Sequence, residues 1–199
     1  MNTENVVLMR MARESLKDRW GLAIGAYLLY LVVAVALQMV PFAGAIAGLI
    51  IAGPLAVGMA TFAIRIARNE EARIEQMFEG FNNFGTALAA YLLMLVFILL
   101  WTLLLIIPGI IAALSYSMTF YILADDPTTD PMHAIDQSKA MMDGHKWKLF
   151  CLMLRFLGWG LLCILTLGIG LLWLVPWMYV TMAKFYDDVK ADAVVPVSV

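Results

Sequence analysis

The residues best suited to bind a charged ligand lie at the start of the last apolar segment of the chain. His145, Lys146 and Lys148 precede this segment, and Arg155 is the single charged residue from Leu149 to Ala183. An ionised side chain inside a membrane span is costly, so it usually faces a cavity, a partner or a polar interface. The pattern makes Arg155 and its three basic neighbours candidates for a site that binds an anionic lipid headgroup or another anionic ligand.

Two simpler explanations for Arg155 stay open. Arg155 lies seven residues after Lys148, about 10 Å along a helix, so its guanidinium can reach back to the membrane surface without a specific ligand. It can also form a structural ion pair. A binding site predicts that Arg155→Leu abolishes selective retention of anionic lipid and leaves the fold intact.

A second group of candidate ligands lies just before this segment, where carboxylates and a histidine follow one another. These are Asp125, Asp126, Asp130, His133 and Asp136. Such side chains can bind a metal ion, but their spacing matches no metal-binding motif, and Asp residues ahead of a helix act as caps. We therefore expect no metal site, no cofactor, no catalytic residues and no enzymatic activity.

Long stretches without charge dominate the chain. Trp20 to Ile64 and Gly80 to Ala124 are each 45 residues long and hold no Asp, Glu, Lys or Arg. A bilayer core about 30 Å thick needs roughly 20 apolar residues per helix, so each stretch suits two spans joined by a tight turn. With the last apolar segment, this pattern predicts an all-α polytopic membrane protein of six transmembrane helices arranged as three hairpins.

The overall composition agrees with this prediction and excludes other classes. Hydrophobic residues make up 63% of the chain, and its mean hydropathy is +0.87. A net charge of -2 offers no basic excess for nucleic-acid phosphates. Six spans use nearly all of the 199 residues, so we expect a single integral membrane domain over 1–199. Its repeat units would be roughly 1–67, 68–126 and 127–190, with a short C-terminal tail, 191–199.

The distribution of charge predicts an orientation. The turns inside the three hairpins, near Pro41, near Pro108-Gly109 and at Thr166 to Gly170, carry no charge, whereas lysines and arginines occupy the other connections. Because positive residues concentrate on the cytoplasmic side, we expect a multi-pass protein of the bacterial cytoplasmic (inner) membrane with both termini in the cytoplasm.

Aromatic residues suggest an internal repeat. Trp20, Phe84 and Trp147 each stand where a charged segment meets an apolar one, as interface anchors do, at intervals of 64 and 63 residues. Each would follow an amphipathic cytoplasmic helix and precede a hairpin, which makes three copies of one unit.

Two amphipathic helices stand out in that pattern. In the first, Leu8, Met11, Ala12, Ser15 and Leu16 fall on one helical face, away from the charged residues. The last has Asp130 as its N-cap, Pro131 as its first residue and Gly144 as its stop signal.

Prolines and glycines mark the return helices of the hairpins. Pro54 and Pro176 each remove a backbone hydrogen bond and can kink a span. Gly53 and Gly58 flank the first of them, and small residues of this kind favour close helix packing. A transporter could use the same kinks as hinges, but the predicted spans contain no acidic residue for an ion or proton relay.

Several short motifs resemble a known family. They are Trp20-Gly21-Leu22-Ala23-Ile24-Gly25, Gly53-Pro54-Leu55 with Gly58, Leu105 to Ile111, Ser115 to Asp125, Gly144-His145-Lys146-Trp147 and Leu165 to Trp173. In order and spacing they resemble the bacterial integral-membrane family catalogued as domain of unknown function nine hundred seventy-five. The resemblance implies a six-span inner-membrane protein, distantly similar to the membrane domains of some glycerophosphodiester phosphodiesterases. It brings no catalytic residues to this chain.

These observations predict a non-enzymatic membrane protein. It would bind lipid, including anionic lipid, an apolar peptide or a membrane-protein partner through its helix bundle and its cytoplasmic helices. The alternative is a small transporter or permeation subunit, which a solvent-filled cavity reaching the membrane midplane would favour.

Overall fold

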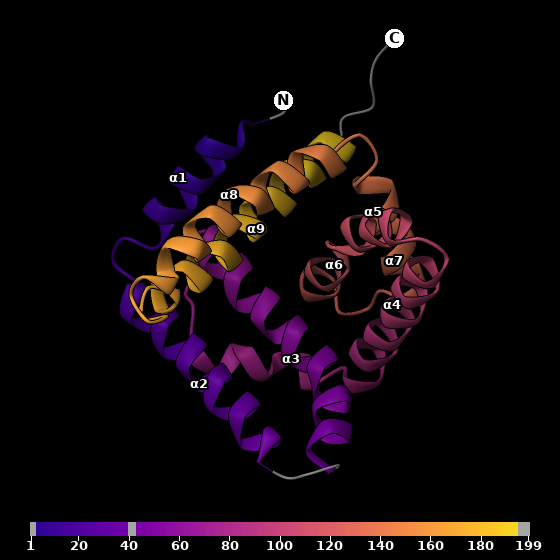
Figure 1. Ribbon diagram of the computed structural model, residues 1–199, viewed down its shortest axis with the longest axis horizontal. Coiled ribbons are helices and arrows are strands. Elements are labelled where there is room, and N and C mark those ends of the chain that lie inside the picture. Colours follow the sequence, from indigo (N-terminus) through magenta and orange to yellow (C-terminus); the bar gives the residue numbers. More distant parts are fainter. Residues whose placement is uncertain (1–2, 40–42, 195–199) are drawn as a thin grey trace.

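The computed structural model describes residues 3–39 and 43–194, and this part of the chain is helical without a strand (Figure 1). The elements are α1 (Asn5–Ser15), α2 (Trp20–Gln38), α3 (Ala43–Ala67), the 3-10 helix η1 (Ile74–Phe81), α4 (Phe84–Leu104), α5 (Ile106–Tyr116), α6 (Thr119–Asp125), α7 (Pro131–Met141), α8 (Lys146–Ile164) and α9 (Leu171–Val194). The turn expected near Pro41 lies outside the described residues.

Five segments of the described chain are long and apolar enough to cross a membrane. They are Trp20–Leu37, Gly44–Ala67, Phe84–Leu104, Ile106–Asp125 and Lys146–Ile164. The chain is therefore a helical membrane protein, as the sequence predicts.

The sixth expected span, α9, does not meet the same criterion. Its uncharged part ends at Ala183, and Lys184, Asp187 and Asp188 follow within the same helix. Thirteen uncharged residues rise only about 20 Å, less than the hydrocarbon core. In Figure 1, the pair α8 and α9 occupies the region between the left and the upper right of the view. The pair α2 and α3 occupies the region below it and reaches the bottom of the view.

Helix α3 lies at the centre of the packing. Half of the residues in its span are buried, against 11% in the span of α2, and α3 contacts α2, η1, α4, α6 and α9. The contact with η1 is made by glycines: a Cβ at Gly58 would overlap the backbone oxygen of Met77, and one at Gly80 would overlap that of Pro54. At Gly53 a Cβ would overlap the backbone of Ala87 on α4. The close packing expected from Gly53 and Gly58 is thus confirmed.

The turn of the second hairpin lies at Leu105, slightly before Pro108-Gly109, near which the sequence predicts it. Leu105 has an extended backbone, and Pro108 and Gly109 lie within the first turns of α5. A proline is well placed there, because the first N–H groups of a helix have no intrahelical partner to lose. Gly109 allows the helices to approach, since a Cβ there would overlap Thr102 of α4.

The return helix of this hairpin is broken between α5 and α6, and a serine of α7 closes the break. The hydroxyl of Ser138 donates to the backbone oxygen of Ser115, 2.8 Å away, and accepts from the backbone N–H of Met118 at 3.2 Å. Ser138 is fully buried. Backbone groups left unpaired by the break therefore find partners inside the protein, as a membrane environment requires.

The boundaries of α7 follow the sequence signals closely. The Asp130 carboxylate accepts from the backbone N–H of Met132, and Pro131 is the first helical residue. The helix itself ends at Met141, and the chain reverses at Gly144, whose φ of +76° suits a glycine. The predicted start of the helix is thus confirmed, whereas the helix ends at Met141, three residues before the predicted stop at Gly144.

The buried face of α1 differs from the prediction at one position. Leu8, Ala12, Ser15 and Leu16 are buried as expected, but Met11 is exposed and Met9 is buried in its place. The reason is that α1 packs against α9 along one side and against α3 and α8 elsewhere, so the buried face is set by several neighbours.

Candidate functional site

Charged side chains from three distant segments meet at the end of α3. Arg68 donates a hydrogen bond of 2.6 Å to Asp125, the last residue of α6, and one of 2.7 Å to Asp187 of α9. These hydrogen bonds raise the pKa of the Arg68 guanidinium above its usual range. Asp125 also accepts from Lys190 and from the Tyr186 hydroxyl. The cluster connects α3, α6 and α9, and each charged side chain in it has a partner of opposite charge within the cluster.

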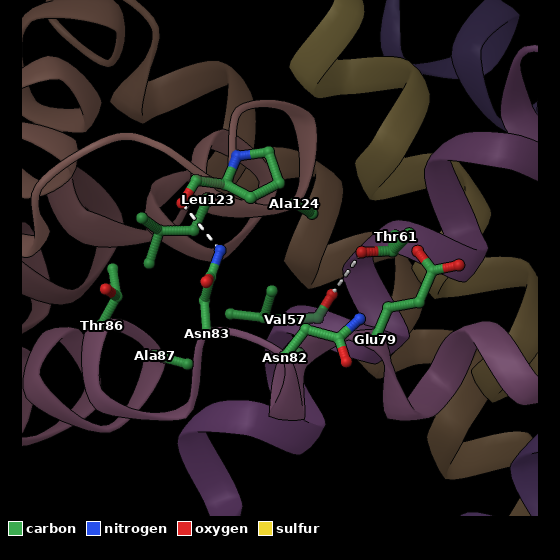
Figure 2. Close-up of a pocket in the computed structure, with 11 residues that line it drawn as sticks. Val57, Thr61, Glu79, Asn82, Asn83, Thr86, Ala87, Leu123 and Ala124 are labelled. Carbon is green, nitrogen blue, oxygen red and sulfur yellow. Dashed lines mark hydrogen bonds between the residues drawn. The ribbon is translucent and has the colours of Figure 1, made fainter.

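A small cavity with several polar side chains in its lining lies between α3, η1, α4 and the end of α6 (Figure 2). Its volume is about 190 Å³. It is lined by Val57, Thr61, Glu79, Gly80, Asn82, Asn83, Thr86, Ala87, Leu123, Ala124 and Pro127.

Most polar groups of this cavity already have protein partners. The Thr61 hydroxyl donates to the backbone oxygen of Val57, the Asn83 amide donates to that of Pro127, and Glu79 pairs with Arg65 at 3.5 Å. The amide of Asn82 and the hydroxyl of Thr86 also line it. The lining holds neither a histidine nor a cysteine, and the cavity is smaller than typical ligand pockets of about 300–1,000 Å³.

Three of the four basic residues singled out in the sequence are paired with carboxylates. Lys148 lies 2.5 Å from Asp188 and His145 lies 3.6 Å from Asp192, both on α9, while Lys146 lies 4.0 Å from Asp143. The pairs of Lys148 and His145 join the start of α8 to α9, whereas the pair of Lys146 is local. The acidic partners on α9 were missed in the sequence, because a contact between two helices leaves no local signal.

Arg155 is placed differently. It is exposed on α8, beside the exposed Leu154 and Leu157, and one helical turn before the exposed Trp159. Within residues 3–39 and 43–194 it makes no hydrogen bond and no ion pair. Its guanidinium is therefore a cation on an otherwise apolar outer surface.

The acidic residues between α6 and α8 serve separate structural roles. Asp126 accepts from Thr128 in the connecting turn, Asp130 caps α7, and Asp136 pairs with Lys139 at 3.3 Å. His133 is exposed on α7. In the described part of the chain, no three His, Cys, Asp or Glu side chains gather as metal ligands would.

The remaining sequence candidates lie as follows. Pro54 and Pro176 are inside α3 and α9, and their role as kinks stays a prediction. Trp147 is largely exposed and stacks on Phe150, and Phe84 stacks on Phe81. Trp20, by contrast, borders a groove together with residues of α1, α8 and α9.

This groove is the feature that the sequence did not reveal. It brings Arg13 of α1 together with three further tryptophans, Trp159, Trp173 and Trp177. The sequence places Arg13 among other basic residues before the first apolar stretch, and nothing local links it to tryptophans more than a hundred residues away.

Fold and charge distribution together define a helical integral membrane protein with a tightly packed central helix and a basic residue facing outward on α8. The chain belongs to the family described as protein of unknown function (DUF975), which matches residues 1–114 and 102–193. No curated protein and no solved structure matches it. The distant similarity to glycerophosphodiester phosphodiesterase membrane domains finds no support in these comparisons.

Proposed function

We propose that this protein is a non-enzymatic membrane protein that binds an anionic lipid through Arg155 on α8. The observation that carries the proposal is the position of Arg155, exposed among apolar side chains and unpaired within the described ranges. A guanidinium at such a place is stabilised by an anion from outside the protein. In a bilayer, the phosphate of a lipid headgroup is the anion within reach.

The pairing of the neighbouring cations supports Arg155 as the principal lipid contact. Lys148 and His145 face carboxylates of α9, so both side chains already have partners within the protein. We infer that the start of α8 adds a weaker contribution, through Lys146, whose partner Asp143 is 4.0 Å away and highly exposed. Surface pairs of this kind contribute little to stability and are readily exchanged for another anion.

The proposed setting is the bacterial inner membrane, with six spans in three hairpins and both termini in the cytoplasm. The order of elements supports the hairpins, since a short helix precedes two long segments three times: α1 before α2 and α3, η1 before α4 and α5–α6, and α7 before α8 and α9. Arg65 and Arg68 at the end of α3 support the orientation, since positive residues stay in the cytoplasm.

The proposal is tested by native mass spectrometry of the protein in mild detergent. The wild-type protein is mixed with equal amounts of phosphatidylglycerol and phosphatidylcholine, and the lipids retained are counted. We expect Arg155→Leu to lose the preference for phosphatidylglycerol, by roughly tenfold for one charge-assisted contact. Arg73→Leu is the matched control, because Arg73 is an exposed cation outside all five candidate spans. An unchanged lipid preference in Arg155→Leu would refute the proposal.

A small transporter is the second candidate, and one feature favours it. The segment Ile106–Asp125 is a discontinuous helix, and such breaks form the substrate sites of many transporters. Here, however, the Ser138 hydroxyl already pairs with the backbone groups at the break that a substrate would otherwise contact. A transporter predicts that Ser138→Ala changes solute flux into proteoliposomes, whereas a lipid-binding protein predicts no flux in either form.

A further inference from the structure

We infer that the groove between α1 and the α8–α9 hairpin is a second lipid site, which takes the phosphate of an anionic phospholipid. Its volume is about 380 Å³, enough for a headgroup but not for a whole lipid. Arg155 does not line it, so this inference does not rest on the proposed function of that residue.

The position of Arg13 in the groove is set by the packing of α1 on α9. The indole N–H of Trp177 donates a hydrogen bond of 2.8 Å to the backbone oxygen of Met9. At the other end of α1, the backbone N–H of Thr3 donates to Asp188 of α9. The two helices therefore run antiparallel, and Arg13, one turn beyond Met9, faces the part of α9 that leads to the hairpin turn.

Tryptophans form the opposite wall of the groove. Trp177 packs edge-on against Phe156 at a ring distance of 5.4 Å and against Trp159 at 6.2 Å. Gly170 closes the far end, because its lack of a side chain lets α9 approach Cys163 of α8. The ring contacts hold Trp159 and Trp177 in place before any ligand binds.

The groove offers hydrogen-bond donors and one positive charge. Arg13 is the only charged residue among the described residues that line it, and it pairs with no carboxylate in the described chain. The indole N–H groups of Trp20, Trp159 and Trp173 donate to no protein atom within those same ranges. A guanidinium beside indole donors, without a carboxylate in the lining, is complementary to a phosphate and repels a cation.

The surroundings favour a lipid over a soluble anion. Exposed apolar side chains lie along α8 on either side of the lining residue Trp159, among them Leu157, Leu161 and Leu162. They can contact the acyl chains of a lipid whose headgroup occupies the groove. Tryptophan is also the residue that concentrates at the depth of lipid headgroups.

The test uses full-length protein in lipid nanodiscs and brominated lipids, which quench the fluorescence of nearby tryptophan. Phosphatidylglycerol and phosphatidylcholine brominated on the chain near the headgroup are compared in the wild type and in Arg13→Gln. We expect phosphatidylglycerol to quench the wild type at roughly tenfold lower mole fraction than phosphatidylcholine. Arg13→Gln should lose this difference, and Arg13→Lys should keep most of it.

Matched variants separate this site from the one proposed at Arg155. Lys17→Gln removes an exposed charge in the turn that follows α1, outside the groove lining, and should behave like the wild type. Because Arg155 lies one turn before Trp159, wild-type Arg13 and Arg13→Gln are also compared in an Arg155→Leu background. The effect of Arg13→Gln should persist there, so failure of either proposal is seen without the other. Circular dichroism and gel filtration confirm that each variant is folded.

Three outcomes would overturn the inference. One is an unchanged preference for phosphatidylglycerol in Arg13→Gln. Another is equal quenching of the wild type by both lipids. The last is full displacement of brominated phosphatidylglycerol by millimolar inorganic phosphate, which would show a site for a soluble anion instead of a lipid.

Discussion

Arg68 and Asp125 join the ends of α3 and α6 through a hydrogen bond of 2.6 Å, although 57 positions separate them in the chain. Asp187 accepts from the same guanidinium, and Lys190 donates to the same carboxylate. This cluster connects helices from all three parts of the sequence. Its hydrogen bonds join oppositely charged partners, and such bonds are stronger than those between neutral groups.

We predict that Asp125→Asn destabilises the protein by about 2 kcal/mol, since hydrogen bonds to charged groups contribute about 1.5–3 kcal/mol each. Thermal unfolding in detergent measures the change. Asp136→Asn is the control: its pair with Lys139 is exposed, so the loss should stay below about 0.5 kcal/mol. Equal destabilisation by the two variants would show that the cluster contributes no more to stability than an exposed ion pair does.

The serine in the break between α5 and α6 leads to a second prediction. Ser138→Ala leaves the backbone N–H of Met118 and the backbone oxygen of Ser115 without their partner, at a cost of about 1–3 kcal/mol. Ser117→Ala should cost less than about 0.5 kcal/mol, because that hydroxyl only bonds back to Leu114 in the same turn. The difference in unfolding midpoint between the two alanine variants tests the role of Ser138.

Replacement of a buried glycine and of an exposed glycine by alanine should change the stability of the protein in opposite directions. Gly58→Ala places a methyl group on the backbone of Met77 and should prevent α3 and η1 from packing. Gly21→Ala meets nothing within 4 Å in α2 and should stabilise the protein by up to about 1 kcal/mol through helix propensity. Expression level and unfolding temperature provide the measurement. A folded Gly58→Ala variant of normal stability would contradict the packing described for α3.

The number of spans can be settled by cysteine labelling. Cys151 and Cys163 are first replaced by serine, and a single cysteine is then introduced at Asn69 or at Thr166. If α8 and α9 both cross the membrane, a membrane-impermeant maleimide labels intact cells at position 166 but not at position 69. Protection of both positions in intact cells, with labelling of both after lysis, would show that the hairpin does not cross.

The sequence by itself determined where the apolar helices lie and where several of them end. Charge-free stretches located the five candidate spans, and Asp130 and Pro131 marked the start of α7. These features are readable because they depend on neighbouring residues: hydropathy decides which segment enters lipid, and a cap satisfies the N–H groups of its own helix.

The tertiary structure decided which side chains meet. It buried Met9 in place of Met11, paired Lys148 with Asp188, and placed Ser138 in the break of another helix. It also left Arg155 facing outward and brought Arg13 beside tryptophans from the opposite end of the chain. Periodicity along one helix shows that a face is apolar, but the neighbour that covers it depends on how all the helices pack. For that reason the groove at Arg13 could be found only in the folded molecule, whereas Arg155 stood out already in the sequence.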